Sequence, residues 1–207
     1  MSPAATATSV PGPEWLARWR EGPWPTDQGL LRFDGLGAVY PEEITGRWRG
    51  SGLHTGHPLD GLLELYGWYG KAIETSEVVH PLLFFGRNGD ISAIDPAHVP
   101  LGLALRRPTL VRSRVARGIF AASHRLLRTG GPTARLRQIE HRGVTSAAIV
   151  YDKQPIIDHL RRIDADRLLG MMDLRSTPPL FFLLSFFLSF SGPGLIVRAS
   201  VGRPSPG

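Results

Sequence analysis

The order of apolar and polar residues in the C-terminal part of the chain predicts strands joined by short polar turns. Arg142-Gly143 separates one pair of apolar stretches, and residues 164–167 separate the next pair. Consecutive strands joined by such short turns pair locally and form an antiparallel meander. The predicted strands are residues 135–141, 144–151, 156–163 and 168–174.

Glycines punctuate a second set of predicted strands in the N-terminal half. In the predicted strand 44–50, Trp48 shares one face with Gly46 and Gly50, because side chains alternate between the two faces. One large aromatic side chain among glycines suits a small barrel that closes at one end. The remaining elements predicted here are a short helix at 59–66, strands at 71–75, 78–85 and 91–94, and a tight turn at 87–90.

Helical spacing appears at the N-terminus and in residues 99–130. Residues 14–21 predict a short helix, and residues 30–39 a connector that packs against the body. Ser113 is a candidate N-cap for a helix that runs to about residue 128. One side of this helix is apolar and the opposite side is basic. The apolar side comprises Val115, Ile119, Ala122 and Leu126, and the basic side Arg114, Arg117, Arg125 and Arg128. The helix therefore suits a lid with a solvated charged face, or a site for an anionic membrane surface or nucleic acid.

Composition limits the classes of function. The 207 residues can bury a core, and the absence of cysteine excludes disulfides, thiol catalysis and thiolate metal sites. The net charge of +6 is concentrated in residues 96–130, which carry seven arginines and no acidic residue. The N-terminus lacks the features of a secretory signal, so we expect a cytoplasmic protein. The uncharged stretch 180–190 is shorter than the roughly 20 residues of a membrane span, and it reads as a final buried strand.

Motifs for catalysis are not found. The sequence has no G-x-S-x-G elbow, no phosphate-binding glycine loop and no zincin motif, so we expect no catalytic residues and no metal site. Asp158 and His159 could form an acid–base pair, but adjacent strand residues point to opposite faces. That geometry argues against joint action.

Five stretches carry a family resemblance. The segments Gly46-Arg-Trp-Arg-Gly50, Thr55-Gly-His-Pro-Leu-Asp60 and Gly67-Trp-Tyr-Gly-Lys71 resemble the GXWXG protein family. Residues 149–160 and 168–173 resemble the C-terminal domain of unknown function that usually accompanies it. The resemblance covers about residues 40–98 and 131–184. It implies a lipocalin-like antiparallel barrel, in the broad group that includes nitrobindin and fatty-acid-binding proteins. The chain departs from the family pattern after Leu184.

We therefore expect a mainly β protein: a lipocalin-like antiparallel β-barrel with a short N-terminal helix and an amphipathic helical insert. Its expected parts are a flexible N-terminus with the short helix (1–38), two barrel halves (39–98 and 131–187), the basic insert (99–130) and a disordered tail (188–207). The expected function is non-catalytic binding of an apolar small molecule or lipid inside the barrel.

The predicted ligand contacts are Trp48, Trp68, Tyr69 and Tyr151, with His54, His57, His80 and His159 for a polar end. Two alternatives stay open. One is a haem- or small-gas-handling barrel of nitrobindin type, with His80 as the iron ligand. The other is an enzyme that acts on a hydrophobic substrate through histidine acid–base chemistry. We expect contact with an anionic membrane through the insert arginines rather than binding of nucleic acid, while the oligomeric state stays open.

Overall fold

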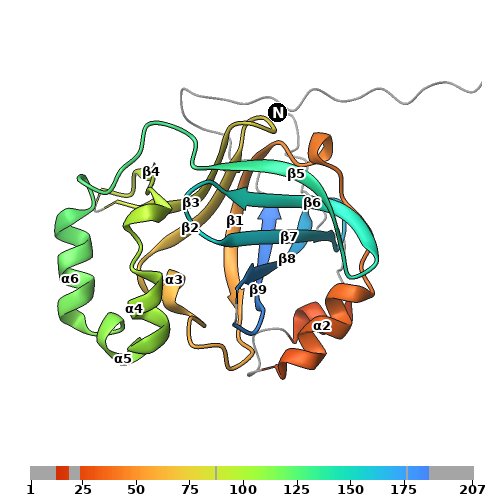
Figure 1. The fold of residues 1–207 in the computed structure, drawn as a ribbon, viewed down its shortest axis with the longest axis horizontal. Helices are drawn as coiled ribbons and strands as arrows, with labels where there is room; N and C mark the ends of the chain where they lie inside the picture. Colours follow the sequence, from red (N-terminus) through yellow and green to blue (C-terminus); the bar gives the residue numbers. More distant parts are fainter. Residues whose placement is uncertain (1–12, 19–23, 87, 176, 187–207) are drawn as a thin grey trace, which may run out of the picture.

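The computed structural model describes residues 13–18, 24–86, 88–175 and 177–186, and its centre is a closed antiparallel β-barrel (Figure 1). Eight strands form the ring in the order β2-β1-β9-β8-β7-β6-β5-β3, and pairing of β2 with β3 closes it. The short strand β4 flanks β3. The strands are β1 (Gly46–Leu53), β2 (Trp68–Ile73), β3 (Val79–Phe85), β4 (Ile91–Ala93), β5 (Ala134–His141), β6 (Val144–Tyr151), β7 (Ile156–Arg162), β8 (Arg167–Leu174) and β9 (Leu180–Phe186). The prediction of a mainly β antiparallel barrel is confirmed.

The ring is weakest between β3 and β5, which share the single residue pair Val79 and Ala134. The other end of β3 pairs with β4 instead. The chain between β4 and β5 carries the helical insert, formed by α4 (Leu101–Arg106), α5 (Pro108–Val111) and α6 (Arg114–Ser123). It stands beside the barrel at this gap, in green in Figure 1.

Helices on the opposite side cover the outer face of the barrel. They are α1 (Glu14–Ala17) and α2 (Thr26–Asp34). The other short helices are η1 (Pro41–Glu43), and α3 (Leu62–Leu65) and η2 (Pro96–His98) beside the insert. Phe33 of α2 packs with Phe181 of β9 and Leu169 of β8 in a second hydrophobic cluster, outside the barrel. The expected connector at 30–39 therefore begins with an unpredicted helix. The predicted helix 14–21 is shorter in the structure, and residues 19–23 lie outside the described part.

Glycines make room for aromatic side chains inside the barrel. Along β1, Gly46, Trp48 and Gly50 are buried while the residues between them are exposed, which confirms the predicted shared face. A Cβ atom on Gly50 would lie 2.2 Å from the Trp68 ring, so only glycine fits there. Trp48 is almost fully buried, and its indole nitrogen donates to the Ile44 carbonyl at 2.9 Å.

Helix α6 packs through a different face from the one that its apolar spacing predicts. Ser113 caps it as expected, accepting a hydrogen bond from the Ala116 amide at 3.1 Å, but the helix ends at Ser123 rather than near residue 128. Phe120 makes the inward contacts, against Tyr66 and Phe84. The apolar side predicted for packing is instead exposed to solvent: Val115 is 72% exposed and Ile119 64%.

The predicted final strand is also present, as β9 ending at Phe186. The predicted tail 188–207 and the first twelve residues lie outside the described part. None of the helices in the described ranges has the length and apolar character needed to cross a membrane.

Candidate functional site

A buried ion pair lies inside the barrel. Lys71 on β2 and Asp158 on β7 are 2% and 1% exposed, and the Lys71 Nζ lies 2.7 Å from the Asp158 Oδ2. Tyr151, the last residue of β6, joins them: Lys71 donates to its hydroxyl at 3.1 Å, and that hydroxyl donates to the same Asp158 oxygen at 3.0 Å. We call Lys71, Tyr151 and Asp158 the buried triad.

The triad satisfies its own charges. An ammonium group has three N–H donors, and the third of Lys71 reaches the Pro81 carbonyl at 3.3 Å. Three aromatic rings also surround the Lys71 Nζ, with Phe182 nearest at 4.8 Å from its ring centroid. Such rings attract a cation through their negative faces. The lysine charge is therefore stabilised by the protein itself, without a bound anion.

Tyr151 stays protonated in this environment. Burial raises the pKa of its phenol well above the ordinary value, and the negative charge and hydrogen bond of Asp158 raise it further. The phenol therefore remains a hydrogen-bond donor to Asp158 at neutral pH.

A β-bulge explains why Lys71 points inward. Its partner on β1 is Trp48, and directly opposed residues share a face, so Lys71 lies on the buried side. Trp68 is buried on the same side, although three residues apart in a regular strand would place the two on opposite faces. Register shifts on either side of Gly70 resolve this, because the extra residue changes the alternation. Gly70 has a φ of 144°, which favours glycine.

A small cavity lies next to the triad. Trp68, Tyr151 and Phe182 line it together with apolar side chains of β3, β7, β8 and β9, and α3 and α4 cover its rim. Its volume is about 90 Å³, well below the roughly 300–1,000 Å³ of typical small-molecule sites. We call it the barrel cavity. Most of the barrel interior is filled by side chains.

A larger hollow lies between the barrel wall and the helical insert. It has a volume of about 740 Å³ and is lined mainly by apolar residues of α3, β3 and α4 to α6, with His98 of η2. We call it the insert groove. Leu62, Leu63, Val99 and Ala104 line both the groove and the barrel cavity, so these four side chains form the boundary between them.

Comparison with known proteins places these features in a family. The model of the GXWXG protein family matches residues 32–89, and the domain of unknown function DUF4334 matches residues 132–185. This chain belongs to the GXWXG family. A crystal structure of a protein from Thermomonospora curvata is similar at 30% identity and a TM-score of 0.59, over 83% of this chain and 95% of that one. The search of curated proteins gave no match.

The buried triad joins the two family segments. Lys71 lies in the GXWXG segment, directly after its Gly-Trp-Tyr-Gly run, while Tyr151 and Asp158 lie in the second matched segment. Sequence reasoning proposed Tyr151 as a ligand contact but missed Lys71 and did not pair it with Asp158. The available signal was the residue type: Lys71 follows Gly70 directly, and it is one of two lysines among 24 basic residues.

The aromatic residues proposed as ligand contacts divide between inside and outside this GXWXG barrel. Trp68 and Tyr151 line the barrel cavity. Trp48 is in the core, away from the cavity lining. Tyr69 packs its ring against Phe85, with the Arg49 guanidinium 5.3 Å from its centroid. Its position after Trp68, on the far side of the sheet, separates it from the cavity.

The proposed histidines do not gather at the barrel cavity. His54 is exposed, and His57 is buried in a turn, where its Nδ1 accepts from the Leu59 amide at 3.1 Å. His80 is half-buried on β3. His159 points to the outer face while Asp158 points inward, the opposed geometry expected for neighbours on a strand.

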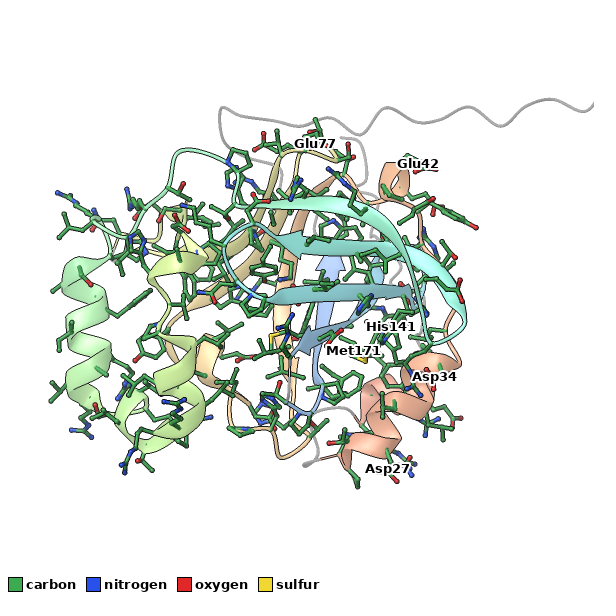
Figure 2. The ribbon with its side chains drawn as sticks, viewed as in Figure 1. Asp27, Asp34, Glu42, Glu77, His141 and Met171 are labelled. Atoms are coloured by element: carbon green, nitrogen blue, oxygen red, sulfur yellow. The ribbon has the colours of Figure 1, made fainter. Side chains whose placement is uncertain are left out.

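His159 belongs to an outer cluster with His141 and Asp173. The two imidazole rings stack at 3.9 Å between centroids, and the His159 Nε2 lies 3.8 Å from an Asp173 carboxylate oxygen. His141 lies on the side of the barrel that α2 covers (Figure 2). Burial lowers the pKa of His159 to about 4, so the imidazole is neutral at pH 7. Arg161 donates to the His141 carbonyl at 2.8 Å. One nitrogen of each imidazole and a carboxylate oxygen of Asp173 lie within 4.8 Å of one another, and neutral imidazole is the form that ligates metal ions.

Proposed function

We propose that this protein binds an apolar small molecule or a lipid chain without catalysing a reaction. The body of the ligand lies in the insert groove and one end reaches toward the barrel cavity. The observation that carries the proposal is the groove itself, whose volume of about 740 Å³ falls in the range of small-molecule sites. The barrel cavity alone, at about 90 Å³, accommodates only a small terminal group.

The buried triad supports an apolar rather than an anionic ligand end. Each N–H of Lys71 already has a protein acceptor, so binding a carboxylate there would require breaking an existing hydrogen bond. A buried donor or acceptor left unpaired costs about 1–3 kcal/mol. A hydrocarbon end against the rings of Trp68 and Phe182 breaks none of the Lys71 hydrogen bonds.

The alternatives that depend on histidine have less support. Haem ligation by His80 and histidine acid–base catalysis both require an imidazole that faces the ligand. Among the described residues that line the barrel cavity there is no histidine, and His98 is the one that lines the insert groove. His98 lies at the exposed end of η2.

The test uses N-phenyl-1-naphthylamine, an uncharged fluorescent probe whose emission increases in apolar sites. Wild-type protein is expected to bind it saturably. Ala104→Trp fills the boundary between groove and cavity, and Ala116→Trp fills the groove from the half-buried side of α6. Each is expected to weaken probe binding tenfold or more, about 1.4 kcal/mol.

Ala165→Trp is the matched control, because Ala165 is exposed in the turn between β7 and β8 and lines neither hollow. Circular dichroism confirms that each variant is folded. The proposal is wrong if folded wild-type protein gives no saturable binding, or if Ala165→Trp weakens binding as much as the two groove variants. Solvent extraction of the purified protein, followed by mass spectrometry, then identifies the natural ligand.

A further inference from the structure

The helical insert exposes an unusual amount of apolar surface. Of the eight large apolar side chains exposed in the described ranges, five lie between residues 101 and 126. Their exposed fractions range from 42% for Leu103 to 83% for Leu126. Single exposed apolar residues are ordinary, but a contiguous group marks an interaction site. The five residues are Leu103, Leu110, Val115, Ile119 and Leu126.

The same segment has positive charge that the protein does not neutralise. Arg112 donates to backbone carbonyls of Pro58 and Asp60, and Arg128 pairs with Asp90. The five other arginines of the insert form no ion pair with any described residue. They are the exposed Arg106, Arg107, Arg114 and Arg125 and the half-buried Arg117. We call these five arginines and the five exposed apolar residues together the insert face, and on α6 the two kinds of side chain lie on different sides of the helix.

Internal packing does not account for the insert face. Helix α6 contacts the barrel through Phe120, whose ring lies 5.4 Å from that of Phe84. Val115 and Ile119 lie on the side that faces solvent. Figure 2 shows nitrogen-tipped side chains that project from α4 to α6 away from the barrel. The insert is therefore anchored by one face and presents another.

We propose that the insert face attaches the protein peripherally to an anionic lipid surface. Helices with this composition lie in the interfacial region, with apolar side chains at the acyl boundary and arginines among the headgroups. Charge complementarity selects the partner, since residues 96–130 contain no acidic residue to repel an anionic surface. Four of the five apolar residues also line the insert groove, so the groove opens within the attached face. The attachment does not depend on ligand binding in the groove.

The experiment is co-sedimentation of the full chain with vesicles of phosphatidylcholine, with or without phosphatidylglycerol. Binding is expected only with phosphatidylglycerol and is expected to weaken with added salt, because surface charges are screened. Arg114→Gln combined with Arg125→Gln is expected to lower the partition coefficient by roughly 30-fold, at the usual contribution of two near-surface arginines. Val115→Gln combined with Ile119→Gln is expected to lower it tenfold or more.

Two matched controls lie elsewhere on the surface. Leu31 on α2 is 64% exposed and Arg47 on β1 is exposed, so Leu31→Gln and Arg47→Gln remove the same chemistry outside the insert face. Both are expected to leave vesicle binding unchanged. The proposal is overturned if wild-type protein does not bind anionic vesicles, or if it binds neutral vesicles as tightly as anionic ones. It is also overturned if the control variants lose as much binding as the insert-face variants.

A second copy of the chain is the competing occupant, and sedimentation velocity identifies it. Self-association that the Val115 and Ile119 substitutions abolish, without vesicle binding, would assign the insert face to a dimer and overturn the lipid proposal. Ala116→Trp separates the two proposals made for this protein. It is expected to lose the naphthylamine probe and keep vesicle binding, so failure of one function is visible without failure of the other.

Discussion

Removing one partner of the buried Lys71–Asp158 pair should destabilise the protein strongly. Lys71→Met keeps a side chain of similar length but leaves the Asp158 carboxylate in the barrel with the Tyr151 hydroxyl as its remaining triad partner. Breaking a buried pair typically costs about 3–5 kcal/mol, because the other charge remains without compensation. With both side chains almost fully buried, water cannot replace the lost ammonium group. We therefore expect a loss in this range.

An exposed ion pair provides the scale for comparison. Arg135 and Asp152 lie 2.9 Å apart, but their side chains are 48% and 34% exposed. Surface pairs of this kind contribute about 0–1 kcal/mol, so Arg135→Gln should change stability little. The double variant Lys71→Met with Asp158→Leu removes both buried charges. It should recover most of the stability that Lys71→Met loses, since apolar replacement of a buried pair is often neutral or stabilising.

Urea denaturation followed by tryptophan fluorescence measures these free energies. At about 2–4 °C per kcal/mol for a protein of this size, Lys71→Met should lower Tm by roughly 6–20 °C. The reasoning is refuted if Lys71→Met costs no more than Arg135→Gln. It is also refuted if the double variant is as unstable as the sum of its two single variants, because the charges would then act independently.

Two further predictions concern the bulge and the outer histidine cluster. Gly70→Ala should lower the free energy of unfolding by several kcal/mol, as measured by urea denaturation. The added Cβ would lie 1.9 Å from the Trp48 carbonyl oxygen, and the φ of 144° suits only glycine. Gly102→Ala is the control, because an added Cβ there has no atom within 4 Å. His159 has its pKa lowered from 6.5 to about 4, so unfolding takes up a proton between those values. Stability should therefore fall by about 3 kcal/mol as pH drops from 6.5 to 4, and His159→Gln should flatten that slope.

The barrel could be predicted from sequence because its strands are short and its turns carry strong signals. Arg142-Gly143 and residues 164–167 mark hairpins that the structure contains, and Gly46, Trp48 and Gly50 share a face as their spacing indicates. Helix α2 was not predicted, because residues 30–39 alone indicate a connector that packs against the body. Gly29 of this helix packs so closely on β9 that a Cβ atom would lie 2.7 Å from the Phe181 ring. A contact with such a distant strand cannot be predicted from the local sequence.

The site was harder to predict because it depends on two features of the assembled sheet. Regular alternation from Trp68 places Lys71 on the outside, and only the bulge at Gly70 brings both inside. Asp158 faces inward because it pairs with Ile149, a core residue of the neighbouring strand. Sequence reasoning correctly separated Asp158 from His159 but kept the histidine as the candidate. The pairing of Asp158 with Lys71, 87 positions away, depends on closure of the ring, which local sequence does not show.

The position of the buried triad suggests why the barrel retains a charged pair that an apolar core would not need. A buried ion pair adds little net stability over apolar residues of the same volume, but a mispaired arrangement leaves one charge uncompensated. Lys71 belongs to the first family segment and Asp158 to the second, whereas residues 90–131, including the whole insert, match neither. We hypothesise that the pair fixes the alignment of the two halves across the insertion. The insert can then carry the groove and the insert face without holding the barrel together, because the halves are joined by the ladder between β1 and β9 and by the buried pair.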